Sequence, residues 1–109
     1  MSKITTHVLD SVLGKPAAGI AVKLERREGH GWNAVAQAET DRDGRCPNLA
    51  LEAEPGVYRL IFATDEYLSR QGRTTIYPEI AITFRCGSDA HYHLPLLLSD
   101  NSYTTYRGS

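Results

Sequence analysis

The chain has 109 residues, the size of one domain, and 41% of them are hydrophobic, which is typical of a globular protein. The 12 Lys and Arg residues are scattered and nearly balanced by 13 Asp and Glu, and the net charge of -1 gives no electrostatic basis for binding nucleic acid or an anionic membrane. No apolar run approaches the roughly 18 residues of a membrane helix, so we expect one domain over residues 1–109 with no nucleic-acid or membrane partner.

Short segments rich in β-branched residues with alternating polarity predict strands, and Gly, Pro, Asn and Asp mark the turns between them. Strands are expected over residues 4–10, 20–26, 32–38, 57–63, 79–86, 90–97 and 102–107. Residues 65–72 lack this alternation, and we expect a short helix there, capped by Thr64 or Asp65 and ended by Gly72. About eight strands with one short helix are typical of an all-β, antiparallel sandwich.

The two cysteines, Cys46 and Cys86, show neither CxxC spacing nor neighbouring metal ligands. We expect both to be free thiols in a reducing compartment. The first residues contain no apolar stretch of the kind found in a secretion signal, so we expect a soluble, cytoplasmic protein.

Alternation along residues 4–10 assigns each side chain to one face of the first predicted strand. Ile4, Thr6 and Val8 share the face expected to join the core, so His7 points away from the core. A histidine in the middle of a strand is more often structural or solvated than catalytic, and His7 alone does not indicate a function.

A second histidine-bearing face lies near the end of the chain. His91, His93 and Pro95 alternate with the core-facing residues of the predicted strand over 90–97. Two histidines at i and i+2 on one strand face can bind a metal, but this pair alone does not establish a metal site, and we expect none. They are either exposed or covered by a second sheet surface, because Pro95 suits an edge or a bulge.

Arg45 directly follows a strong turn, Asp41-Arg42-Asp43-Gly44, in which Gly44 supplies a positive φ. An arginine in this position is usually a solvated charge. It can also be held rigidly enough to bind a carbonyl group or an anion.

The last residues form a β-favouring run that ends in Tyr106, so we expect ordered structure there although chain ends usually fray. The carboxylate of Ser109 would then lie near ordered structure. No nucleophile elbow, phosphate-binding loop, dinucleotide fingerprint or pair of carboxylates appears. From the residues alone, we expect a β-sandwich with one histidine-bearing face.

Several stretches together resemble the transthyretin-like family, and they span essentially the whole chain. They are Thr6 to Asp10, Gly14 to Ala17, Thr40 to Arg45, Tyr77 to Ile80, His91 to Ser99 and Tyr103 to Ser109. The terminal Tyr106-Arg107-Gly108-Ser109 is the specific part, because it separates the family's 5-hydroxyisourate hydrolases from its hormone carriers. Asp100, Asn101-Ser102 and Cys46 depart from the family pattern, and all three are expected to be peripheral to the chemistry.

The resemblance implies a transthyretin-like sandwich that hydrolyses 5-hydroxyisourate to 2-oxo-4-hydroxy-4-carboxy-5-ureidoimidazoline in urate breakdown, without metal or organic cofactor. It implies catalytic roles for His7, Arg45, His93 and Ser109. It also implies that His7, Arg45 and Tyr106 contact the substrate. The carboxylate of Ser109 would orient a histidine or the water, and which histidine is the base stays open.

The same resemblance implies a homotetramer, a dimer of dimers whose outward sheet faces form a channel containing the sites. Two other functions remain as alternatives. One is a transthyretin-like carrier that binds a small ligand without chemistry, and the other is a structural or adhesive sandwich. A polar channel lined by His7, His93 and Tyr106 disfavours the carrier, and an ordered tail beside histidines disfavours the scaffold.

Overall fold

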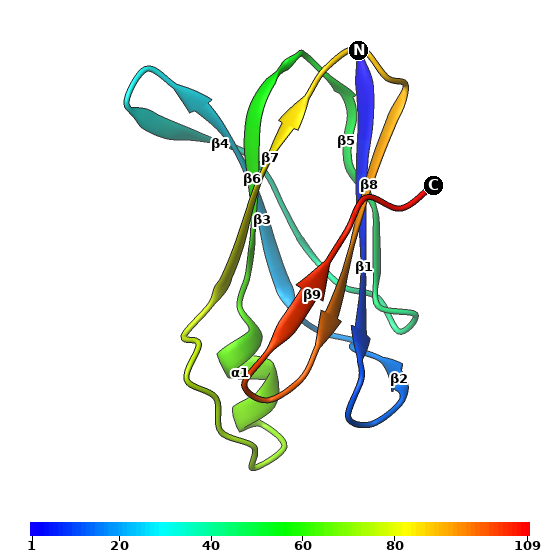
Figure 1. Ribbon diagram of the computed structural model, residues 1–109, viewed down its shortest axis with the longest axis vertical. Coiled ribbons are helices and arrows are strands. Elements are labelled where there is room, and N and C mark those ends of the chain that lie inside the picture. The colour runs from blue at the N-terminus through cyan, green and yellow to red at the C-terminus, as the bar shows by residue number, and fades with distance from the viewer.

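The structure is a computed structural model that describes residues 1–109. Two β-sheets pack face to face as a sandwich, and one short helix lies at the end where β3 begins and β6 finishes (Figure 1). The elements are β1 (Ser2–Asp10), β2 (Lys15–Pro16), β3 (Ala21–Glu28), β4 (Gly31–Glu39), β5 (Arg45–Ala53), β6 (Gly56–Phe62), α1 (Thr64–Ser69), β7 (Ile80–Cys86), β8 (His91–Leu98) and β9 (Tyr103–Thr105). The predicted all-β sandwich with one short helix is confirmed.

The first sheet has the order β2-β1-β8-β9, with β5 also paired to β1, and the second has the order β4-β3-β6-β7. Every pair is antiparallel except one, because β1 runs parallel to β8 over eight residue pairs from Lys3↔His91 to Asp10↔Leu98. The first strand and the penultimate strand of the chain, β1 and β8, therefore lie side by side, and their outward side chains share one surface.

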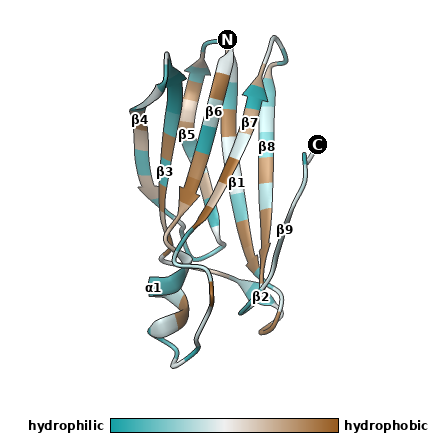
Figure 2. Cartoon of the chain, turned by 60° about the vertical axis from the view of Figure 1, so that its left-hand side comes forward, coloured by the Kyte–Doolittle hydropathy of each residue, from teal (hydrophilic) through white to brown (hydrophobic).

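The core lies between the sheets and follows the alternation of each strand, visible as successive bands of apolar and polar residues in Figure 2. The predicted core faces are confirmed: Ile4, Thr6 and Val8 on β1 are buried, as are the core-facing residues of β8. Burying one such aliphatic side chain contributes roughly 1.5–3 kcal/mol. The core thus fixes which side chains of β1 and β8 point outward.

Strand β5 was not among the predicted elements. Its burial pattern does not alternate, it contains Pro47, and its pairing with β1 shifts register between Ser2 and Ile4 and again between Ile4 and Thr6. Such bulges place two residues opposite one and break the period of two on which the prediction depends. The two-residue strand β2 was not predicted either. The boundaries of the remaining strands differ from the predicted ones by a few residues at most.

The helix α1 is shorter than predicted, and its predicted cap is wrong. Ala63 occupies the N-cap position, and no side chain caps the helix. Its end follows the prediction more closely: Arg73 N donates to Leu68 O and Gly72 N to Ser69 O, the two bonds of a Schellman motif closed at Gly72. No helix is long and apolar enough to cross a membrane.

Beyond this helix, a buried ion pair ties the connecting segment to the first sheet. Arg73 lies 2.6 Å from Asp10, whose side chain is fully buried, and 2.7 Å from Asp100. Tyr67 donates a further hydrogen bond to Asp10. Burial raises the pKa of Asp10, but the hydrogen bonds from Arg73, Leu13 N–H and Tyr67 outweigh it and hold that pKa below 3.8. The departure at Asp100 thus has a structural role.

Candidate active site

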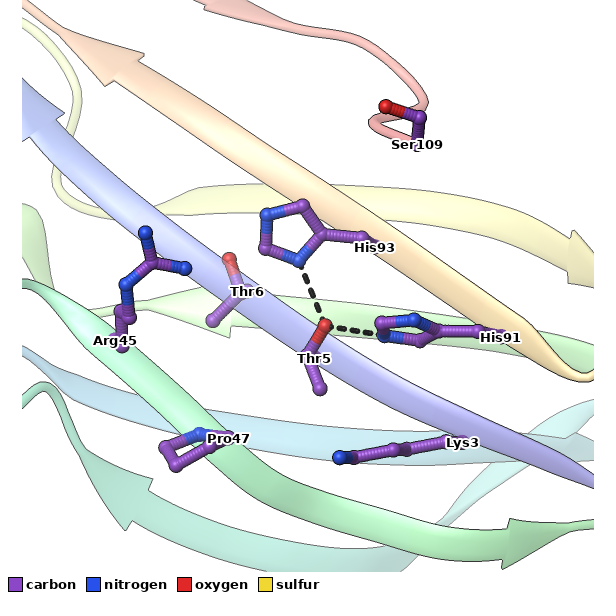
Figure 3. A pocket seen from close by; sticks show the side chains of 8 residues that line it. All are labelled: Lys3, Thr5, Thr6, Arg45, Pro47, His91, His93 and Ser109. Carbon is purple, nitrogen blue, oxygen red and sulfur yellow. Dashed lines mark hydrogen bonds between the residues drawn. The ribbon is translucent and has the colours of Figure 1, made fainter.

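The outward face of the first sheet carries a pocket of about 260 Å³ (Figure 3). Its walls come from β1, β5, β8 and the tail, and its lining holds charged and polar side chains together with one proline. The lining residues are Lys3, Thr5, Thr6, Arg45, Pro47, His91, His93 and Ser109.

Arg45 is the first residue of β5 and enters this pocket directly after a tight turn that Gly44 makes possible. Gly44 has φ 77°, and a Cβ there would lie 2.3 Å from the carbonyl oxygen of Val8, so no other residue fits. Asp41 accepts hydrogen bonds from the backbone N–H of Asp43 and of Arg45, which closes the turn. The guanidinium of Arg45 makes no ion pair or hydrogen bond within the chain, so it is free to bind a ligand.

His7 stands beside Arg45, its partner in the β1–β5 register, but it does not line the pocket. Its Nε2 lies 2.8 Å from the carbonyl oxygen of Asp43. A carbonyl can only accept, so Nε2 carries the proton and a neutral His7 has its lone pair on Nδ1. His7 therefore braces the turn that presents Arg45.

His93 is held from two sides. Its register partner on β1 is Thr5, whose Oγ1 lies 2.7 Å from Nδ1. On the other side, Gly108 N donates to His93 O at 2.8 Å, and a Cβ on Gly108 would lie 2.7 Å from His93 Cδ2. The ring is thus packed against a residue without a side chain. Nε2, the remaining nitrogen, has no partner within the chain and is free to act on a ligand.

The surroundings of His93 favour its neutral form. Burial lowers the pKa of His93 below 6.5, and the neighbouring charges of His91, Arg45 and His7 lower it further. A neutral imidazole with a free Nε2 can accept a proton at neutral pH, which is the property required of a general base.

The tail runs along the edge of β8 toward which the backbone groups of His93 and Pro95 point. Pro95 O accepts from Thr105 Oγ1, and His93 O accepts from Gly108 N, so these residues direct their backbone groups toward the tail rather than toward β1. The pairing between β8 and the tail is interrupted between Thr105 and Gly108. Pro95 lies opposite this interruption, so its lack of an N–H removes no hydrogen bond between β8 and β1.

Arg107 fixes the end of the tail outside the pocket. Its guanidinium lies 2.9 Å from Asp89 and stacks 4.4 Å from the ring centre of Tyr92, and it donates to His91 O. Such a cation–π contact contributes about 0.5–1 kcal/mol at an exposed site. Arg107 therefore anchors the tail so that Ser109 reaches the rim of the pocket, above His93 in Figure 3.

Of the predicted site residues, Arg45, His93 and Ser109 line one pocket. His7 lies beside it, and Tyr106 is exposed and outside the lining. The prediction missed the other five lining residues. Alternation could have indicated three of them, since Lys3 and Thr5 share the face of His7 and His91 shares that of His93. It could not have indicated Thr6, assigned to the core, or Pro47, on an unpredicted strand.

The chemical groups in the pocket supply acid–base and cationic functions. No group of three or more His, Cys, Asp or Glu side chains is placed to hold a metal ion. Both cysteines are buried, and burial raises the pKa of the Cys46 thiol to about 11, so this thiol is not a nucleophile at neutral pH. The available chemistry is a neutral histidine base, a free guanidinium, an ammonium group and hydroxyls.

Comparison with known proteins identifies relatives that include 5-hydroxyisourate hydrolases and transthyretins. A 5-hydroxyisourate hydrolase of Salmonella dublin is 44% identical over 97% of this chain and 80% of its own length. The structure of Klebsiella pneumoniae 5-hydroxyisourate hydrolase matches with a TM-score of 0.91 and 33% identity over the whole of both chains. Sea bream transthyretin in complex with thyroxine matches with a TM-score of 0.93 and 35% identity over 97% of this chain and 94% of its own. The family model described as the HIUase/Transthyretin family matches residues 4–108, and the chain belongs to that family.

Proposed function

We propose that this protein hydrolyses 5-hydroxyisourate to 2-oxo-4-hydroxy-4-carboxy-5-ureidoimidazoline, a step of urate breakdown. The observation that carries the proposal is the pocket in which His93 Nε2 and the Arg45 guanidinium are both free of partners within the chain. The relatives named as 5-hydroxyisourate hydrolases support the choice of substrate.

In the proposed reaction, His93 Nε2 takes a proton from water and the oxygen adds to a ring carbonyl carbon. The carbonyl oxygen becomes negatively charged, and Arg45 stabilises it. When the carbonyl reforms, the ring C–N bond breaks and the leaving nitrogen takes the proton back from His93. General base catalysis contributes about 10²–10⁴-fold, and an oxyanion donor about 10²–10³-fold. Water is the only co-reactant.

The other residues take positioning and binding roles in this proposal. Lys3 adds a second cation for the substrate carbonyls from the same face of β1. His7 braces the turn that holds Arg45 and extends the contact with the substrate beyond the lined pocket. Ser109 orients the water from the rim of the pocket. Tyr106 contacts the part of the substrate that extends beyond the lined pocket.

The polarity of the pocket also argues against a carrier of apolar ligands. A small-molecule carrier site is expected to be lined mainly by hydrophobic and aromatic side chains with few polar groups. Apart from Pro47, the lining of this pocket is polar or charged. The hydrolase is therefore the better supported of the two functions found among the relatives.

The decisive experiment mixes purified protein with freshly prepared 5-hydroxyisourate and follows the ultraviolet decay of the substrate. We expect micromolar protein to accelerate the decay, and His7→Ala and Arg45→Ala each to lower kcat/KM at least ~10²-fold while the thermal unfolding curve is retained. An unchanged decay with wild-type protein would favour the carrier, which a thyroxine titration would then test. Near-wild-type turnover in either variant would refute the corresponding role.

We further propose that four copies assemble with their pocket-bearing faces toward one another, so that each open pocket becomes a shared, water-excluding cleft. Exposed apolar side chains beside the first sheet support such a contact, among them Val12, Leu13 and Tyr106. Light scattering coupled to gel filtration measures the assembly, and a monomer at micromolar concentration would refute it.

The two buried, unpaired thiols fit a reducing compartment, and we propose that the protein is cytoplasmic.

A further inference from the structure

The hydroxyl of Thr5 lies between two imidazole rings. Its Oγ1 is 2.7 Å from Nδ1 of His93 and 2.8 Å from Nε2 of His91, as the dashed lines in Figure 3 show. The ring centres are 6.0 Å apart, so the rings do not bond each other directly. Thr5 is 94% buried, whereas His91 is exposed. The bridge therefore connects a half-buried ring at the pocket with a ring open to solvent.

Proton counting constrains this arrangement. A threonine hydroxyl has one proton and so donates only one hydrogen bond. When Thr5 donates to His91, the other contact requires that His93 Nδ1 carries a proton, and a neutral His93 then has its lone pair on Nε2. When Thr5 donates to His93 instead, His91 Nε2 carries the proton and a neutral His93 is protonated on Nε2. The two neutral rings thus have coupled tautomers, and only the first arrangement makes His93 a base toward the pocket.

We propose that His91, Thr5 and His93 form one acid–base unit, in which Thr5 transfers a proton between the rings and His91 shares the positive charge that His93 acquires. This inference rests on the proposed function. His93 is the catalytic residue of the unit, and Thr5 and His91 are positioning residues that act through it.

The proton balance of the unit closes within one turnover. His93 Nε2 takes a proton from water, and His93 then carries protons on both nitrogens. Its Nδ1 proton moves to Thr5 Oγ1 while the Thr5 proton moves to His91 Nε2, so the positive charge passes to His91. When Nε2 gives its proton to the leaving nitrogen, both shifts reverse and the starting tautomers return. No redox or additional partner is needed.

The charges around His93 explain why moving the positive charge is useful. Arg45 faces His93 from β5, Lys3 and His7 come from β1, and Ser109 closes the rim from the tail. A positive charge on His93 would be the third beside Arg45 and Lys3, and it is disfavoured in a half-buried site. His91 is exposed to water, which solvates the charge at lower cost. The bridge thus lowers the free-energy cost of protonating His93 beside these cations.

Three variants separate the unit from a merely structural hydroxyl. Thr5→Val keeps the β-branched shape but removes the bridge, Thr5→Ser keeps the bridge, and His91→Gln keeps a polar partner for Thr5 that cannot take up a proton. We expect kcat to fall roughly tenfold or more in Thr5→Val and His91→Gln with KM within about twofold, below the ~10²–10⁴ of a whole general base. We expect Thr5→Ser to restore kcat, and Thr83→Val, an exposed strand threonine of β7, to have no effect.

A titration of the free protein tests the unit without any substrate. Side-chain ¹⁵N NMR resolves which imidazole nitrogens carry protons, and coupled groups titrate as a pair. We expect one proton between His93 Nδ1 and His91 Nε2 at neutral pH, both rings responding in the same first protonation step, and independent titration of the rings in Thr5→Val. Independent rings in the wild type, or wild-type kcat in His91→Gln, would overturn the proposal. If the wild type does not turn over 5-hydroxyisourate, the proposed function fails while the NMR titration still decides the coupling.

Discussion

Replacing Gly108 by alanine tests whether the tail positions His93, the histidine that we propose as the general base. Gly108 does not have a positive φ, so alanine is compatible with its backbone, and the effect comes from contact alone. The new Cβ would lie 2.7 Å from His93 Cδ2, whereas ordinary van der Waals contact begins at 3.4 Å. The ring or the tail must therefore shift by about 0.7 Å, and a displacement of 1 Å at a reacting group can cost ~10²-fold in rate.

We expect Gly108→Ala to lower kcat/KM by about 10–10²-fold, because either His93 turns away from Thr5 or Ser109 leaves the rim. The tail lies on the surface, so the free energy of unfolding should change by no more than about 0.5 kcal/mol. Initial rates of 5-hydroxyisourate decay and thermal unfolding followed by circular dichroism measure the two quantities. Gly31→Ala is the matched control, since its Cβ meets only one atom, at 4.0 Å. Equal kcat/KM in the two variants would refute the positioning role of the tail.

Three further predictions follow from the charges and the tail. Arg45→Gln removes a cation that lowers the pKa of His93, so we expect that pKa to rise toward 6.5, and an unchanged NMR titration of His93 would contradict the assignment. The pKa of Asp10 is lowered on folding, so Asp10 contributes stability above pH 3.8 that is lost as the pH falls through the folded-state pKa. Asp10→Asn removes the buried partner of Arg73 and leaves it only the partly exposed Asp100 and Gln71, so at pH 7 it should cost less than the roughly 3–5 kcal/mol of a fully orphaned buried charge, and urea unfolding should show a flatter acid dependence than wild type. Removing residues 106–109 should lower kcat/KM at least ~10²-fold with a nearly unchanged circular dichroism spectrum, and retained turnover would show that the tail is dispensable.

The faces of the strands could be predicted because alternation is a local property of the backbone. It correctly divided β1 into a core face with Ile4 and Val8 and an opposite face with Thr5, which lines the pocket. Strand pairing is not local: Thr5 and His93 are 88 residues apart and meet only through the parallel β1–β8 register. For this reason the bridge between Thr5 and the two histidines could not be predicted from alternation.

The candidate site was predicted in part, by residue types near turns and by family resemblance. Arg45 could be singled out because a turn that requires glycine holds it, and the close approach of Gly44 to β1 is the physical reason. His7 and Tyr106 were expected to contact the substrate, but neither lines the pocket of a single chain. Their roles remain predictions that depend on a larger substrate or on a second copy covering the sheet.

The sandwich also explains how one family can contain both hydrolases and transthyretins with nearly the same backbone. Core and pocket share the same strands but use opposite faces, since Tyr92 and Leu94 on β8 point inward while His91 and His93 point outward. Outward substitutions change the chemistry of the face without altering the packing that fixes the fold. Fold similarity therefore does not decide between these functions. What favours catalysis here is the tail, because Gly108 both bonds to the backbone of His93 and leaves room for its ring.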